Sequence, residues 1–375
     1  MAEKKESRFA NLDALRILSM ILIILLHSID HSGVLEAAPA SGAATNFYVR
    51  FTYMLTQICV NCYVMISGYF LIRSRFKFQK LVQLWMEVSF YAILIKFIFM
   101  ITGEIPFSPS ALLSCLVPIF TGRYWFITIY AGMYLLSPFL NMAILAMNRR
   151  QHTALCVLLF GLFSVWVSVY PAFAGMNSGG GWGVPWFTVL YVIAAWFRLH
   201  YVPADKWKGR ILAWVLMSLF VAAAYCTAYD RFHIIQRLAG NWYRYDSVFA
   251  CVSTIAVFAA FLNMRIESRR VTSVMTYIAP FTLGVYLIHA HANLSPYLWN
   301  KLNLPRFVGQ WYFAPLQLGI VLVVFTTCIG IDILRKSTVG RLENSRAVLS
   351  FCDKVTAKVN GIMNHDENSD SKRAG

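Results

Sequence analysis

Residues 11–27 read NLDALRILSMILIILLH, an apolar run that contains three ionisable side chains, Asp13, Arg16 and His27. In a helix with about 3.6 residues per turn, positions eleven residues apart share one face, and a rise of about 1.5 Å per residue separates them by roughly 16 Å. Asp13 precedes Arg16 by three residues, a spacing that permits an ion pair. Because ionisable groups inside a membrane helix are costly, all three are candidate functional residues.

The composition of the whole chain agrees with a membrane protein. Of 375 residues, 58% are hydrophobic and only 13% are charged, with a formal net charge of +16. Soluble domains carry about 45–50% apolar and about 25% charged residues, so the composition excludes a disordered chain and argues against a soluble enzyme. A basic excess is also typical of nucleic-acid binding, but that interpretation fails if the basic residues lie between membrane spans.

Ten segments are long and apolar enough to approach the length of about 20 residues that a spanning helix needs. They are Leu12–Ile29, Tyr48–Ile72, Leu81–Ile101, Tyr124–Met147, Ala154–Tyr170, Gly183–Phe197, Ile211–Tyr229, Ser247–Asn263, Met275–Ala292 and Gln310–Leu334. Ser108–Phe120 is apolar but too short to cross, which favours a re-entrant or interfacial segment. The predicted fold class is therefore an all-α polytopic helix bundle.

The basic residues predict the orientation of this bundle. With a cytoplasmic N-terminus, 24 of the 33 Lys and Arg residues fall in cytoplasmic segments and 7 in outer loops, and the excess alternates from loop to loop. We therefore expect both termini in the cytoplasm and no nucleic-acid partner. The predicted division is a cytoplasmic tail at 1–11, a transmembrane domain at 12–334 and a polar, partly unstructured cytoplasmic tail at 335–375.

An alternative interpretation of the N-terminus is a cleaved signal peptide, because a small-residue run at 37–44 follows the first apolar segment. That run begins well beyond the apolar stretch, and cleavage would leave nine spans and invert the charge pattern. We therefore expect the first segment to remain as a membrane helix.

The positions of Arg16 and His27 suit a reaction whose two substrates come from opposite sides of the membrane. A guanidinium binds the phosphates of an anionic cofactor on the cytoplasmic side. An imidazole in the outer half can take the proton of an acceptor hydroxyl. The alternatives are an Arg16 that only reaches the headgroups and a His27 that is a structural, hydrogen-bonded core residue.

Several segments resemble the acyltransferase-3 family of bacterial integral-membrane acyltransferases. In this family a basic residue, ten intervening residues and a histidine occur in the first span, as Arg16 and His27 do here. Three further matches follow in order, namely VMISGYFL at 64–71, YWFITIYAGMYLLSPFLN at 124–141 and LGVYLIH at 283–289. Together with the ten-span layout, they cover the chain from residue 11 to about 334.

The resemblance implies an O-acyltransferase in the bacterial cytoplasmic membrane that uses acetyl-CoA as co-substrate and no metal. The acyl group, usually acetyl, is delivered to a cell-envelope glycan or lipid-linked saccharide, and membrane lipid is the other expected partner. His27 would be the catalytic base or a transient acyl carrier, with Arg16 at the CoA end and Asp13 as its ion-pair partner. The oligomeric state is not predicted.

Five further residues are predicted to bind substrate. Arg73 and Arg75 lie where some family members carry paired arginines, although they also fit ordinary cytoplasmic positive charges. Tyr124 and Trp125 could line an acceptor channel, because sugar rings stack on aromatic side chains, or could anchor the helix at the membrane interface. His289 lies near the outer end of the ninth span, where it could assist proton transfer or simply occupy the interface.

Two other function classes fit parts of the sequence. In a transporter or flippase, Asp13, Arg16 and His27 would form a proton or substrate relay, but the two halves show no internal similarity of the kind that inverted repeats produce. A glycan polymerase or ligase usually has a large outer loop, and no outer loop here exceeds about twenty residues.

Overall fold

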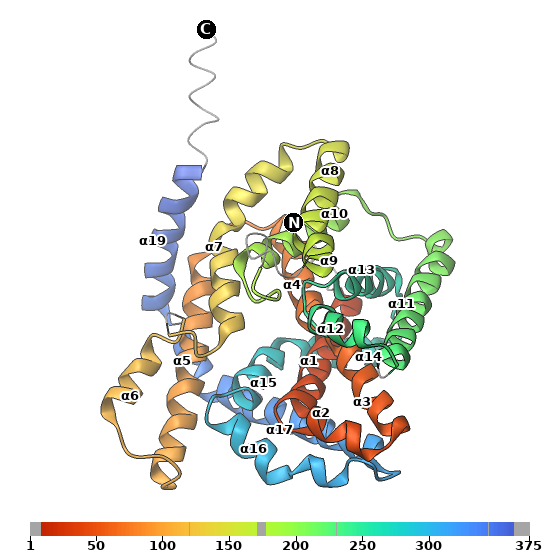
Figure 1. The fold of residues 1–375 in the computed structure, drawn as a ribbon. Helices are drawn as coiled ribbons and strands as arrows, with labels where there is room; N and C mark the ends of the chain where they lie inside the picture. The colour runs from red at the N-terminus through yellow and green to blue at the C-terminus, as the bar shows by residue number, and fades with distance from the viewer. Residues whose placement is uncertain (1–8, 120, 171–177, 230, 344, 364–375) are drawn as a thin grey trace.

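The computed structural model of the chain describes residues 9–119, 121–170, 178–229, 231–343 and 345–363 (Figure 1). Within these ranges the elements are helices joined by turns, and none is a strand. The all-α prediction is therefore confirmed. The N-terminal basic residues at 4–8 and the last residues of the C-terminal tail lie outside the described ranges.

Eight helical segments of the described chain are long and apolar enough to cross a membrane, and two shorter apolar helices accompany them. The long segments are α1 (Ala10–Asp30), α3 with α4 (Ala43–Thr56 and Ile58–Leu71), α5 (Phe78–Ile101), α7 (Trp125–Leu145), α8 with α9 (Arg149–Phe160 and Trp166–Val169), α11 (Lys208–Tyr229), α14 with α15 (Arg269–Ile278 and Thr282–His289) and α17 (Phe313–Thr338). The shorter helices are α10 (Val184–His200) and α13 (Val248–Asn263). Each of the ten predicted spans thus corresponds to a helix or a pair of helices.

The connections carry further short helices. These are α2 (Val34–Ala37), α6 (Pro109–Leu113), α12 (His233–Trp242), α16 (Leu294–Leu302) and α18 (Gly340–Glu343), with 3₁₀ turns at Ala38–Ser41, Ser114–Leu116, Asp205–Trp207, Ala279–Phe281 and Leu304–Phe307 and a π turn at Gly161–Val165. The predicted non-crossing segment after α5 is α6 with its following turn, which is too short to span a bilayer.

Part of the C-terminal tail forms a helix. Its residues Arg346–Met363 form α19, which packs along α5. The backbone N–H of Phe78 donates to the Thr356 hydroxyl over 3.0 Å, and the rings of Phe78 and Phe351 meet edge to face. Apolar residues at 348, 351, 352, 355 and 359 follow helical periodicity and supply the packing face. This part of the tail is therefore a packed helix.

Helix α1 is the centre of the bundle (Figure 1). It packs against α3, α4, α13, α14, α15 and α17, so most of its length is enclosed by protein. A polar side chain on this helix can therefore face other protein groups rather than lipid. This position explains how α1 can carry ionisable residues and still cross the membrane.

The Ser-Gly pair at the end of the second predicted span lies where two helices pack closely. A Cβ at Gly68 would lie 3.0 Å from the Cα of Tyr191 and 3.1 Å from the Cβ of Ala194. Glycine therefore allows α4 and α10 to approach closely, while the neighbouring Ser67 side chain lines a cavity.

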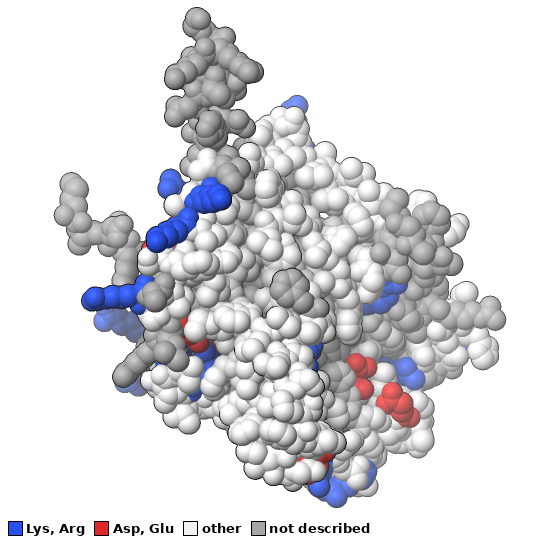
Figure 2. Space-filling model, turned by 90° about the vertical axis from the view of Figure 1, so that its left-hand side faces the viewer, with Lys and Arg blue, Asp and Glu red and all other residues white. Residues whose placement is uncertain are grey.

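The outer surface of the bundle is mostly uncharged. On the face in Figure 2, white side chains cover a broad area, and Lys and Arg lie in separate groups around it. Large apolar side chains such as Phe97, Ile98, Phe139 and Phe220 are exposed along the long helices. A surface of this kind is compatible with a hydrocarbon surrounding and not with water.

A buried ion-pair cluster joins the end of α17 to α5 and α18. Arg335 contacts Glu87 over 3.0 Å and Asp332 over 2.7 Å, and it also pairs with Glu343. The Tyr91 hydroxyl donates to Asp332 over 2.7 Å. Buried charges are stable only when they are paired and hydrogen-bonded in this way.

This cluster explains the glycine of the LGVYLIH segment. A Cβ at Gly284 would lie 2.3 Å from the carboxyl carbon of Asp332. The carboxylate is held by Tyr91 and Arg335 and cannot move aside without loss of these contacts.

We expect Gly284→Ala to destabilise the protein by about 1–3 kcal/mol, the usual cost of overpacking a core. Thermal unfolding in detergent measures this as a lower melting temperature. The matched control is Gly319→Ala in α17, where an added Cβ meets nothing within 4 Å and better helix propensity applies. Equal melting temperatures for the two variants would contradict the described packing.

Candidate active site

The charged face of α1 is arranged as the sequence predicts. Arg16 and Asp13 form an ion pair with an N···O distance of 3.6 Å. Arg16 lines one cavity, and His27, eleven residues further along the helix, lines another. The two side chains therefore serve different compartments of one interior site.

A histidine from α15 sets the tautomer of His27. Nδ1 of His289 lies 2.6 Å from the carbonyl oxygen of Val285 and therefore carries the donated proton. Its Nε2 is then the acceptor, and it lies 3.1 Å from Nδ1 of His27. By this hydrogen-bond chain neutral His27 is protonated on Nδ1 and keeps the lone pair on Nε2.

His31 continues the histidine stripe beyond the end of α1. Its ring stacks on that of His27 with centroids 4.4 Å apart, and its Nδ1 lies 3.3 Å from the Ser295 hydroxyl. Burial lowers the pKa of His31, although Asp30 beside it acts in the opposite direction. A neutral His31 ring at neutral pH can pack on His27 without charge repulsion.

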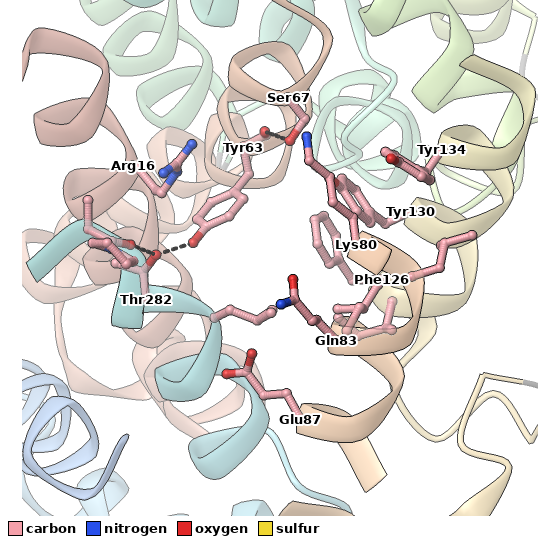
Figure 3. A pocket seen from close by; sticks show the side chains of 16 residues that line it. Arg16, Tyr63, Ser67, Lys80, Gln83, Glu87, Phe126, Tyr130, Tyr134 and Thr282 are labelled. Atoms are coloured by element: carbon pink, nitrogen blue, oxygen red, sulfur yellow. Dashed lines mark hydrogen bonds between the residues drawn. The ribbon is translucent and has the colours of Figure 1, made fainter. Parts of the chain in front are cut away.

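The first cavity has a volume of about 300 Å³ and two cationic groups in its wall. Figure 3 shows Arg16 and Tyr63 on one side, with Lys80 and Gln83 reaching toward them from α5. Glu87 also faces the cavity, but its charge is balanced by Arg335 outside it. Since Lys80 is exposed, the cavity has a positively charged rim in contact with solvent.

The second cavity is narrow, with a volume of about 20 Å³, and it adjoins the first. Tyr63, Phe126 and Leu283 line both cavities and so form their common wall. A path from Arg16 to His27 passes these three side chains. The second volume holds about one or two water-sized groups, so only a small group fits beside His27.

The Tyr63 hydroxyl has a defined partner in this wall. It forms a short hydrogen bond with the Thr282 hydroxyl. Because Thr282 donates its own proton to the carbonyl oxygen of Ala279 over 2.8 Å, Tyr63 is the donor in their contact. This bond fixes the Tyr63 ring between the two cavities.

Aromatic rings form the wall on the other side of His27. Trp125 and Tyr245 line the second cavity. Trp125 stacks on Trp182 with ring centroids 4.6 Å apart, and Trp182 is 53% exposed. The aromatic wall therefore runs from the His27 compartment to the protein surface.

The loop that carries Trp182 is held by the segment before α13. The Ser178 hydroxyl donates to Asp246 over 2.5 Å, and Arg244 forms an ion pair with the same carboxylate at 2.8 Å. The backbone N–H of Tyr245 donates to the carbonyl oxygen of Gly180 over 3.2 Å. These contacts place Trp182 over Trp125.

The remaining predicted residues lie elsewhere. Tyr124 is buried and donates its hydroxyl proton to the Leu287 carbonyl over 2.8 Å, so it positions α15 and lines neither cavity. Arg73 and Arg75 are exposed in the connection between α4 and α5 and also line neither cavity. Their predicted role in substrate binding stays a prediction.

Several residues of the site are not among the candidates that the sequence indicates. In the sequence, Lys80 is one of several basic residues in a cytoplasmic connection. Tyr63 lies one residue before the VMISGYFL segment, and its four-residue spacing from Ser67 is the signal that places both on one helix face. Tyr245 and Trp182 lie in connections, and the sequence holds no pattern that joins them to Trp125. Within the described residues, no group of three or more His, Cys, Asp and Glu is placed to hold a metal ion.

The fold and the site define a polytopic α-helical membrane protein with a histidine pair buried beside two adjoining cavities. A comparison with protein families then identifies its chemistry. The model of the acyltransferase-3 family, described as an acyltransferase domain, matches residues 9–335. The chain therefore belongs to this family and is a multi-pass membrane acyltransferase. No curated protein and no solved structure matches the chain.

The hydrogen bond between His27 and His289 predicts a positioning role for His289. His289→Ala removes the acceptor of the His27 Nδ1 proton, and the loss of about 1–1.5 kcal/mol corresponds to about a tenfold lower kcat for acyl transfer with little change in KM. His289→Gln offers a carbonyl oxygen at this position and should restore most of the rate. A glutamine variant as slow as the alanine variant would contradict the positioning role.

Proposed function

We propose that the protein is an O-acyltransferase of a bacterial cytoplasmic membrane that moves an acetyl group from cytoplasmic acetyl-CoA to a hydroxyl of a cell-envelope glycan or lipid-linked saccharide. The observation that carries this proposal is the common wall of Tyr63, Phe126 and Leu283. It joins a cationic cavity on one side to the His27 compartment on the other. The predicted charge pattern of the loops assigns the cationic cavity to the cytoplasmic side.

The donor end of the site has the chemistry that CoA requires. Arg16 and Lys80 supply positive charge for phosphate groups. Gln83 and Glu87 offer oxygen acceptors for the amide N–H groups of the pantetheine arm. With the phosphates near Lys80, this long, narrow arm can pass Tyr63 and bring the thioester toward His27.

His27 is the general base of the proposed reaction. Its Nε2 takes the proton of the acceptor hydroxyl as the hydroxyl oxygen attacks the thioester carbonyl. The new C–O bond forms, the C–S bond breaks, and the proton passes to the departing CoA sulfur. His289 holds the His27 ring in the tautomer that this step needs.

The small compartment beside His27 supports acetyl as the acyl group. Its volume of about 20 Å³ leaves little room for a longer chain. Tyr63 and Phe126 line this compartment, and their rigid, packed rings leave no space for the extra methylene groups of a longer acyl chain.

The aromatic wall supports a saccharide as the acceptor. The flat apolar face of a sugar ring can pack on the exposed Trp182, while a hydroxyl reaches past Trp125 toward His27. The acceptor and the donor then approach His27 from opposite ends of the site.

A comparison of His27→Ala with Arg16→Ala tests this proposal. Without its base, the His27 variant should transfer acetyl at least about a hundredfold more slowly, yet bind CoA normally. The Arg16 variant loses a charge-assisted contact and should bind CoA about tenfold or more weakly. Calorimetry measures the binding, and base-released acetate from envelope glycans of the expressing cells measures the transfer.

His233→Ala is the matched control for the His27 variant, because His233 is exposed in α12 and lines neither cavity. This control should retain both CoA binding and glycan acetylation. Normal levels of ester-linked acetate in cells that carry only the His27 variant would overturn the proposed function.

A further inference from the structure

A large groove lies at the edge of the bundle, apart from the His27 site. It has a volume of about 950 Å³ and lies between α8, α10, α11 and α13. Figure 1 shows α11 at the periphery, joined to α10 by the connection at residues 201–207. None of the residues that line this groove lines either cavity of the active site.

The groove has one charged end. Arg149, Lys206 and Arg210 line it, and no carboxylate is among its lining residues. The neighbouring Asp205 forms an ion pair with Lys208 over 2.8 Å instead. The three cations therefore attract an anion to this end.

Tryptophan rings hold these cations at the charged end. Arg149 lies over the Trp196 ring at 5.8 Å, and Lys206 and Arg210 lie 5.3 and 5.4 Å from the Trp207 ring centroid. Tryptophan beside basic residues is typical of the level of the lipid headgroups. The charged end of the groove is thus built like a membrane interface.

The rest of the groove is mostly apolar and about one leaflet deep. On α8 its lining residues include Arg149, Thr153, Val157 and Phe160, which recur at helical spacing on one face. The eleven steps from Arg149 to Phe160 span about 16 Å of helix. A hydrocarbon core of about 30 Å has leaflets of about half that thickness.

We propose that this groove binds one anionic diacyl phospholipid from the leaflet on the side of Arg149, which the loop charges assign to the cytoplasm. The phosphate headgroup lies among Arg149, Lys206 and Arg210. The acyl chains lie along the apolar walls of α8, α10, α11 and α13. No carboxylate lines the groove to pair with a headgroup cation, so an anionic lipid fits better than a zwitterionic one. The apolar walls are about one leaflet deep, so they fit a lipid rather than a soluble anion.

Lipid titration of the purified, delipidated protein tests the site by native mass spectrometry. Phosphatidylglycerol and phosphatidylcholine with identical chains are the two probes. The wild-type protein should bind phosphatidylglycerol at least about tenfold more tightly than phosphatidylcholine at one site, because basic residues near an anionic headgroup attract its charge. Equal affinity for the two lipids would overturn the proposal.

Charge variants separate this groove from general attraction to the membrane surface. Arg149→Gln, Lys206→Gln and Arg210→Gln combined should abolish the preference for phosphatidylglycerol. The control combines Arg150→Gln, Arg265→Gln and Arg270→Gln, which removes the same charge from exposed positions outside the groove and should keep the preference. Equal loss in both triple variants would assign the preference to the surface and overturn the site.

A groove-filling variant tests the apolar part without a change of charge. Ala213→Trp places a large ring where a small residue of α11 lines the groove. It should remove the single tightly bound lipid while the melting temperature of the lipid-free protein stays unchanged. Undiminished binding in this folded variant would show that the acyl chains do not occupy the groove.

Discussion

The structure depends on one constraint: ionisable side chains in a membrane must face other protein groups and not hydrocarbon. Helix α1 meets this constraint because six other helices surround it. Its Arg16 pairs with Asp13 on one level, and its His27 bonds to His289 on another. The neighbouring helices meet the same constraint. Helix α15 brings His289 into contact with His27, and α4 leaves room for the two cavities.

The consequence is an interior site with two ends of different character. Arg16 and Lys80 make one end cationic, while Trp125 and Trp182 make the other aromatic. The compartment beside His27 is small, so only small groups can lie next to the imidazole. The ion pairs of Arg335 join α5, α17 and α18 near the cationic cavity, and the pair with Glu87 holds that side chain at the cavity wall.

The sequence predicts the bundle well because apolar length is a local property that each segment carries by itself. The shared face of Arg16 and His27 is also local, since it follows from helix geometry alone. The contact of His27 with His289 could not be derived, because it joins residues 262 positions apart. The same holds for the wall that Tyr63 shares with Leu283, and for Trp182, whose place depends on how one loop packs on another. Helix α19 is hard to predict because its apolar stripe lies among many polar residues, so the mean hydropathy of the tail does not reveal it.

In the proposed function, donor and acceptor reach His27 from opposite sides of the membrane. Proteoliposomes with uniformly oriented protein test it most directly, with labelled acetyl-CoA supplied only on the side of Lys80 and a glycan acceptor only on the other side. We expect labelled ester on the glycan in this arrangement and none when the two compartments are exchanged. Transfer that requires donor and acceptor on the same side would contradict it.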